Sequence, residues 1–193
     1  MSRPKISVCV PTHEIPEKGF FLKRLQESLE KQTFQDFELV ITEDGKMAEN
    51  SNSAIKKAKG EIIKMLYMDD YLYSPYALQD IVDNYEGTWM ASGCLHDDGK
   101  TIGQAHYPTW NDDVKYGKNT IGSPSVIAFP NDNPLLFDER MTWLLDCHLY
   151  GRLFERYGHP TLINKLDIGI GVGPHQMTNK LSEEEKAIEH TYL

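Results

Sequence analysis

The sequence has no apolar run long enough to cross a bilayer, and its first residues, Met-Ser-Arg-Pro-Lys, lack the apolar core of a signal peptide. Both absences favour a soluble, cytoplasmic protein without a membrane span. Cysteine is scarce as well: Cys9, Cys94 and Cys147 are widely spaced and lie in or beside apolar segments. Buried free thiols in a reducing compartment are the expected state of such residues.

Positive charge is in short supply. The 193 residues include 20 Lys and Arg against 29 Asp and Glu, which gives a formal net charge of −9. A nucleic-acid-binding protein needs a basic surface, so this composition argues against such a partner. An acidic protein that binds an anionic ligand needs a metal ion or helix N-termini at the site. The length and an apolar fraction of 40% predict one globular domain.

The most informative stretch runs from residue 60 to residue 72. Its β-forming apolar residues predict a buried strand, and two adjacent carboxylates, Asp69 and Asp70, follow it. Ligands collect at the carboxyl ends of strands in α/β sheets, and paired carboxylates there suit a divalent cation. An Asp-Asp pair taken alone is more often a solvated turn. Ser74 and Pro75 then predict a helix start, and the order of strand, acidic turn and helix favours a site.

Two earlier strands also end in polar residues. These strands are predicted over 5–11 and 37–42, with helices over 19–31 and 52–59 between the strands. Thr12, His13 and Glu14 follow the first strand, and Glu43 and Asp44 follow the second. The alternation of strands and helices predicts a parallel sheet with its loops at one edge. Asp44 before a glycine is equally typical of a plain turn.

The second half of the chain has fewer repeats of this pattern. It predicts a hairpin over 88–107, a loop over 107–122 beside the site edge, strands over 123–129 and 162–172, a helix from 144 to 158, and a short, frayed helix from 182. Asp146 lies near a helix N-terminus, where the simpler interpretation is a carboxylate stabilised by the helix dipole. His175 follows the last strand, and a lone histidine is more often structural than a ligand.

The motifs, taken together and in order, resemble family 2 glycosyltransferases of the GT-A fold. They are Val8–Thr12, Gln32-Thr33, Glu43-Asp44-Gly45, Asn52 with Ala58-Lys59-Gly60, Asp69-Asp70, Phe137-Asp138-Glu139, and Asp146 through Leu153. The resemblance covers almost the entire chain. It implies a single α/β, Rossmann-like domain over 1–193, with a mostly parallel central sheet flanked by helices and a smaller antiparallel element on the acceptor side. Residues 1–86 would bind the nucleotide sugar, 87–180 the acceptor, and 181–193 would form a C-terminal tail.

The same resemblance implies an activity. Members move a sugar from a nucleotide diphosphate sugar to a hydroxyl of a glycan or polysaccharide acceptor, most often with inversion, and use Mn²⁺ or Mg²⁺. By that resemblance Asp146 is the general base, and Asp69, Asp70 and His175 lie at the metal. The donor nucleotide would be bound by Pro11, Thr12, Glu14, Glu43, Asp44, Asn52 and Asp69. UDP is the expected nucleotide, because a carboxylate accepts a hydrogen bond from the imide N–H of uracil.

Three positions depart from the family pattern. Glu43 stands where aspartate is usual, Ser51 where an arginine often precedes the asparagine, and Leu145 where a glutamate usually precedes the base. Two alternatives stay open. A sugar-phosphate nucleotidyltransferase would usually carry a glycine-rich, basic loop after the first strand, which residues 11–16 lack. The second alternative is a nucleotide-sugar-binding domain without catalytic activity.

Overall fold

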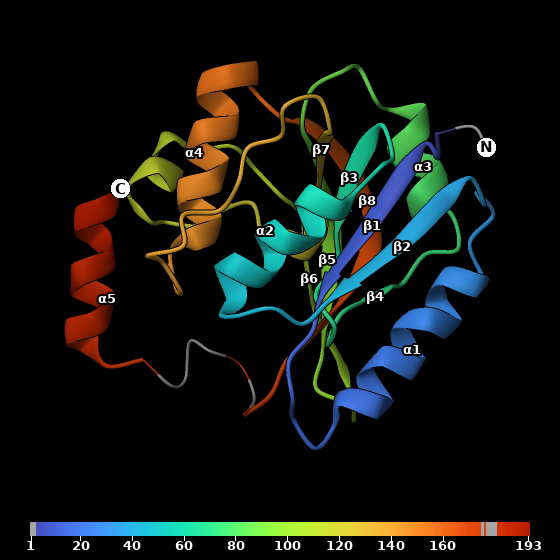
Figure 1. Ribbon diagram of the computed structural model, residues 1–193, viewed down its shortest axis with the longest axis horizontal. Coiled ribbons are helices and arrows are strands. Elements are labelled where there is room, and N and C mark those ends of the chain that lie inside the picture. Colours follow the sequence, from blue (N-terminus) through green and yellow to red (C-terminus); the bar gives the residue numbers. More distant parts are fainter. Residues whose placement is uncertain (1–2, 175, 177–180) are drawn as a thin grey trace.

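A single eight-stranded sheet forms the centre of the computed structural model, which describes residues 3–174, 176 and 181–193. The strands are β1 (Ile6–Pro11), β2 (Phe37–Thr42), β3 (Ile62–Met65), β4 (Tyr71–Leu72), β5 (Met90–Asp97), β6 (Ile102–His106), β7 (Ile127–Pro130) and β8 (Thr161–Gly171). The α-helices are α1 (Lys18–Glu30), α2 (Met47–Lys57), α3 (Ala77–Asp83), α4 (Leu145–Tyr157) and α5 (Glu183–Glu189). Short 3₁₀ helices are η1 (Asp112–Tyr116), η2 (Pro124–Val126) and η4 (His190–Tyr192). The helices lie around the sheet, with α4 and α5 together on one side (Figure 1).

The sheet is mixed and curled, in the order β2-β1-β3-β7-β5-β8-β4 with β6 paired to β5. β1 pairs in parallel with β2 and β3, and β5 pairs in parallel with β8; the other four pairings are antiparallel. The predicted α/β domain is confirmed, and β2-β1-β3 forms a parallel unit with helical crossovers. Beyond β3 the sheet is less parallel than predicted, because β6 and β7 are reached through loops, and antiparallel neighbours need no helical crossover. Both predicted halves contribute strands to this one sheet.

Several predicted boundaries are confirmed. β2 covers residues 37–42 as expected, and α1 buries Phe21, Leu25 and Leu29 on the face that its periodicity predicts. The hairpin of β5 and β6 is present, and Asp98 accepts hydrogen bonds from the amides of Lys100 and Thr101 in its turn. Local signals thus locate most elements of the fold.

The region around the acidic pair differs from prediction at two boundaries. β3 ends at Met65, because the Tyr67 amide donates to the Ser125 side chain at 2.8 Å instead of to a neighbouring strand. The helix expected from Ser74 begins only at Ala77. The reason is that Tyr73 donates its amide to Asp167 O at 2.7 Å, which ties the chain to β8 after the short strand β4.

Other differences follow from side-chain caps. α2 begins at Met47, five residues before the predicted start, because the Glu49 carboxylate accepts the Lys46 amide at 2.8 Å and caps this end of the helix. The loop over 107–122 contains the 3₁₀ helix η1, and residues 124–126 form η2 before β7 begins. α5 has the capping box expected at Ser182, but it is packed against the protein through the buried Glu189 and is not a frayed tail.

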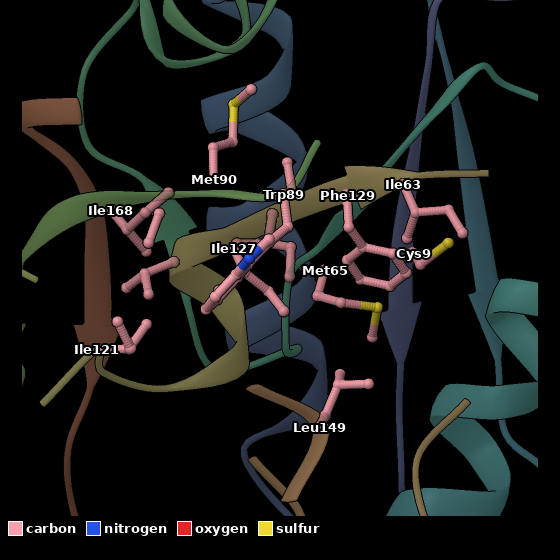
Figure 2. Close-up of a cluster of buried hydrophobic side chains, with 14 of the residues drawn as sticks. Cys9, Ile63, Met65, Trp89, Met90, Ile121, Ile127, Phe129, Leu149 and Ile168 are labelled. Carbon is pink, nitrogen blue, oxygen red and sulfur yellow. The ribbon is translucent and has the colours of Figure 1, made fainter. Parts of the chain in front are cut away.

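The core lies on the strands of the sheet and under α4. Figure 2 shows part of it, including Trp89, Met65, Phe129 and Leu149. Cys9, Cys94 and Cys147 are buried and unpaired, as expected. β1 is buried along its whole length, as a central parallel strand should be. A rigid central strand positions the loops that follow it.

Candidate active site

The acidic pair is held in a tight turn beyond the carboxyl end of β3. The Asp70 amide donates to Tyr67 O at 2.9 Å, and Asp70 Oδ1 accepts the Gly171 amide of β8 at 2.8 Å. A Cβ at Gly171 would overlap the Asp69 carbonyl oxygen, so only glycine permits this approach. The glycine-rich end of β8 therefore receives the acidic turn.

A cation from α1 clamps the same turn. Arg24 donates to the Asp69 carbonyl oxygen and, at 3.1 Å, to Asp97 Oδ2 of β5. Its guanidinium lies 4.4 Å from the centre of the Tyr71 ring, and the Tyr71 hydroxyl donates to the same Asp97 oxygen at 3.0 Å. The backbone of the turn is thus held by β8 through the Gly171 amide and by α1 through Arg24.

Burial dominates the electrostatics of Asp70. It raises the pKa of this carboxyl well above its ordinary value, and the neighbouring Asp69 charge raises it further. Hydrogen bonds from Ser125 and from the Gly171 amide act in the opposite direction. A cation close to such a buried carboxylate would stabilise its charged form, because it offsets the lost hydration.

A buried lysine lies behind the turn. Lys64 of β3 is fully buried, and its Nζ donates to the carbonyl oxygens of Ser125 and, at 3.4 Å, Ile127. Burial lowers the pKa of Lys64 to about 7, against the attraction of Asp167 and Asp70. Lys64 therefore anchors the segment whose Ser125 side chain meets both Tyr67 and Asp70.

Asp146 lies in the first turn of α4 and has two hydrogen-bond donors. Its Oδ1 accepts the Cys147 amide at 2.6 Å, and its Oδ2 accepts the Asn119 side chain at 2.6 Å. Desolvation raises the pKa of Asp146 to about 6, while these hydrogen bonds lower it. Its pKa therefore lies below 7, so Asp146 can accept a proton at neutral pH.

Two adjoining cavities bring these carboxylates together. The smaller cavity, about 160 Å³, is lined by Asp69, Asp70 and Asp146, together with His13, Met47, Tyr67, Ser123, Pro124, Thr142, Trp143, Leu145, Ile170, Gly171 and Gln176. The larger, about 390 Å³, is lined by Pro11, His13, Gly45, Lys46, Met47, Asn50, Tyr67, Met68, Asp69, Thr142 and Leu181. Asp69 lies on the wall of both. The arrangement provides an acidic compartment beside a larger, mainly apolar one.

The other predicted donor-binding residues are placed unevenly. Pro11 lines the larger cavity, whereas the Thr12 hydroxyl donates to Thr42 O at 3.0 Å within the sheet. Glu14 and Glu43 both pair with Lys18, at 2.5 and 2.7 Å. None of Thr12, Glu14 and Glu43 is among the described residues that line the cavities.

Two further predicted residues have partners of their own. The Asp44 carboxylate accepts from Ser53 at 2.6 Å and from Lys57 at 3.0 Å. The Asn52 side chain is buried. Its Nδ2 donates to Phe137 O at 3.0 Å, and its Oδ1 accepts the Phe137 amide at 2.8 Å. Neither Asp44 nor Asn52 is among the described residues that line the two cavities. His175 lies outside the described residues.

Sequence reasoning left several wall residues unassigned. His13 lies two residues after the end of β1, and Tyr67 is the first residue of the turn that contains Asp69 and Asp70. These two positions carried a usable signal. Asn119 and Trp143 lie in aperiodic segments, and their contacts with the site depend on residues far away in the chain.

The residues present fit a divalent cation in part. Asp69 and Asp70 offer hard oxygen donors on one cavity wall, which suits an ion that keeps waters and binds ligand phosphates. Within the described ranges no group of three or more His, Cys, Asp or Glu side chains is arranged to hold a metal. A cation at this turn would therefore depend on ligand oxygens and water for the rest of its coordination.

The sequence matches no known family model and no curated protein. Solved structures do match. S. aureus TarS 1-349 superimposes with a TM-score of 0.66 at 18% identity, over 86% of this chain and 60% of that one. The chain has the GT-A fold.

Two further structures share this GT-A fold. One is S. aureus TarS 1-349 in complex with UDP-GlcNAc, with a TM-score of 0.65 at 16% identity over 92% of this chain and 61% of that one. The other is the mannosyltransferase PcManGT from Pyrobaculum calidifontis in complex with GDP-Man and Mn²⁺, with a TM-score of 0.61 at 15% identity over 90% and 59%. The present chain therefore spans about 60% of the length of these structures. Among its described residues, no helix has the length and apolar character that a membrane crossing requires.

Proposed function

We propose that the protein is a metal-dependent, inverting glycosyltransferase that moves a sugar from a nucleotide diphosphate sugar to a hydroxyl group of a glycan or other acceptor. The observation that carries the proposal is the wall of the smaller cavity, where Asp69 and Asp70 meet Asp146 beside a second cavity large enough for part of a nucleotide. The shared fold with proteins whose structures are complexes with UDP, UDP-GlcNAc and GDP-Man supports the same class of donor.

In this proposal the acidic turn holds the diphosphate end of the donor. Asp70 and Asp69 bind Mn²⁺ or Mg²⁺, with His175 as a further candidate ligand. A bound divalent ion stabilises the negative charge that develops on the leaving diphosphate. The larger cavity, with Pro11 and His13 on its wall, receives the nucleoside.

Asp146 acts as the general base on the other side of the transferred sugar. Its carboxylate takes the proton from the acceptor hydroxyl while that oxygen forms a bond to the anomeric carbon and the bond to the diphosphate breaks. Attack from the side opposite the leaving group inverts the anomeric configuration. Asn119 and the Cys147 amide orient the carboxylate and help to keep it ionised.

UDP remains the expected nucleotide, with Glu43 and Asp44 as the predicted base-selecting residues and Thr12, Glu14 and Asn52 as further predicted donor contacts. The ion pairs of Glu43 with Lys18 and of Asp44 with Lys57 imply that these carboxylates must exchange partners, or act through the loop they hold, to influence the base. A role in cytoplasmic assembly of a polysaccharide is consistent with a family 2 transferase and is part of the proposal.

A thermal-shift panel with UDP, GDP and UDP-GlcNAc, each with and without Mn²⁺, tests donor class and metal together. Binding to the native state alone raises the melting temperature, so UDP with Mn²⁺ should stabilise more than the sum of the two. Slow release of UDP from a UDP-sugar in the same samples separates a transferase from a binding domain. Pyrophosphate-dependent formation of UTP would instead indicate a nucleotidyltransferase.

A further inference from the structure

The C-terminal segment is docked at the start of α4 through one buried carboxylate. Glu189 accepts the amides of Thr142, Trp143 and Leu144, each at 2.8 Å. These three amides lie just before the first residue of α4, where the helix itself provides no acceptor. A carboxylate there also complements the positive end of the helix dipole.

The same segment contacts the loop that carries Asn119. A Cβ at Gly117 would lie 2.9 Å from Cε1 of His190 and 3.2 Å from Cδ1 of Leu193, so the loop and the C-terminus are in close contact. The His190 ring meets the Trp143 ring edge-on at 5.6 Å. Figure 1 shows the C-terminus beside α4 and η1. We call residues 182–193 the C-terminal brace.

The C-terminal brace thus touches both structures that bond Asp146. The first turn of α4 supplies the Cys147 amide to Oδ1, and the loop after η1 supplies the Asn119 side chain to Oδ2. Thr142 and Trp143, whose amides Glu189 binds, are themselves on the wall of the smaller cavity. Within α4, the Tyr150 hydroxyl also joins these two elements by donating to Gly122 O at 2.9 Å.

We propose that Glu189 is a positioning residue: by binding the three amides before α4, it fixes the direction of the Asp146 carboxylate in the cavity. This inference rests on the proposed function, because it assumes that Asp146 is the general base. Lys186 Nζ, 5.5 Å from the centre of the Trp143 ring, and the His190 ring both pack against the Trp143 side chain.

Glu189→Gln is the first test, with the exposed Glu184→Gln on the same helix as its control. The glutamine keeps the size of the side chain but loses the charge and one of the two acceptor oxygens. The probe reaction is UDP release from UDP-GlcNAc with Mn²⁺ and water as the acceptor. We expect kcat to fall roughly 10- to 100-fold, with KM for the donor within about twofold, because a misplaced base slows the reaction without altering donor binding.

A second readout needs no substrate. Carboxyl ¹³C NMR titration of Asp146 should give a higher pKa in Glu189→Gln than in the wild type, because a displaced carboxylate loses the hydrogen bonds from Asn119 and the Cys147 amide that favour its charged form. Glu184→Gln should leave this titration unchanged. If Glu189→Gln lowers the melting temperature but changes neither kcat nor the Asp146 titration, Glu189 is only a tether and the proposal is overturned.

Glu189→Asp covers the case in which Glu189→Gln fails to fold. It keeps the charge but shortens the side chain by one methylene, so it should fold and give a kcat between wild type and Glu189→Gln. Wild-type kcat and titration in Glu189→Asp would overturn the proposal, because the shorter side chain cannot keep all three bonds in their present geometry. A wild type without donor turnover refutes the transferase assignment, whereas the Asp146 titration still tests the brace.

Discussion

Asn119 donates its side-chain amide to Oδ2 of Asp146 at 2.6 Å, across 27 positions of sequence. The donor comes from an irregular loop and the acceptor from the first turn of a helix. This bond favours the charged form of the carboxylate against the effect of burial, and a general base must be charged to accept a proton. The loop over 107–122 therefore contributes a side chain to the site.

Asp146→Asn should lower transfer turnover by roughly 10²- to 10⁴-fold while leaving the affinity for UDP with Mn²⁺ within about twofold. The substitution keeps the shape of the side chain and removes its basicity. Turnover by UDP release and affinity by calorimetry give the two numbers. Glu155→Gln, an exposed charge deletion on the same helix, serves as the control. Near-wild-type turnover in Asp146→Asn would transfer the role of base to another residue, with His175 the next to test.

The pH profile of turnover should report the same carboxyl. Since the pKa of Asp146 is raised to about 6, kcat should rise with pH up to that region and then level off. Asn119→Ala removes a hydrogen bond to the charged form, so the rising limb should move to higher pH. The neutral, exposed change Tyr116→Phe in the same loop should not move it. A limb that stays in place in Asn119→Ala would argue that another group controls the profile.

Asp70→Asn should separate stability from function. Burial disfavours the charged carboxylate, which raises its pKa well above the ordinary value, so a neutral amide of the same shape should raise the melting temperature of the ligand-free protein at pH 8. The same change should abolish the extra stabilisation that Mn²⁺ gives in the presence of UDP. Differential scanning fluorimetry measures both, with the exposed Asp132→Asn as the control. A metal response that survives in Asp70→Asn would contradict its assignment as a ligand.

Lys64 should make the unfolding free energy depend on pH above neutrality. Its pKa is about 7 in the folded protein and 10.5 ordinarily, so between these values the unfolded chain binds more protons. Stability from this group therefore increases as the pH rises from about 7 to 10, by at most about 1.4 kcal/mol per pH unit. Urea unfolding of Lys64→Met should lack this slope, while the exposed Lys56→Met should keep it. Equal slopes in the wild type and Lys64→Met would show that the pKa of Lys64 is not lowered in the folded protein.

Local chemistry explains which features could be predicted from the sequence. The periodicity of α1 and the capping box at Ser182 depend on neighbouring residues, and both are present as predicted. Ser74 shows the limit of such signals. Its hydroxyl accepts the Tyr76 amide at 3.1 Å, yet the helix begins only at Ala77, after the amides of Tyr73 and Ser74 have bonded Asp167 O of β8. Pairing with a distant strand overrode a local start signal.

The same distinction between local signals and long-range contacts applies to the candidate site. The acidic pair and Asp146 have recognisable positions relative to a strand end and a helix start, and they share a cavity wall. The contacts that orient them, from Arg24, Asn119 and Glu189, come from residues far away in sequence. No periodicity or cap reports such contacts, because each depends on how separate elements pack.

The curled sheet also sets the order in which the site can assemble in time. Residues 66–70 join β3 to β4, although β7, β5 and β8 lie between these two strands in the sheet. Asp70 reaches its partner Gly171 across 101 positions of sequence, so we expect this contact to form only after β8 has joined β5. Contacts between distant residues form slowly, whereas β1, β2 and β3 pair over much shorter separations. In pulse-labelled refolding, the amides of Tyr73 and Gly171 should thus become protected after those of β1, and the acidic turn should be among the last parts of the protein to acquire its native geometry.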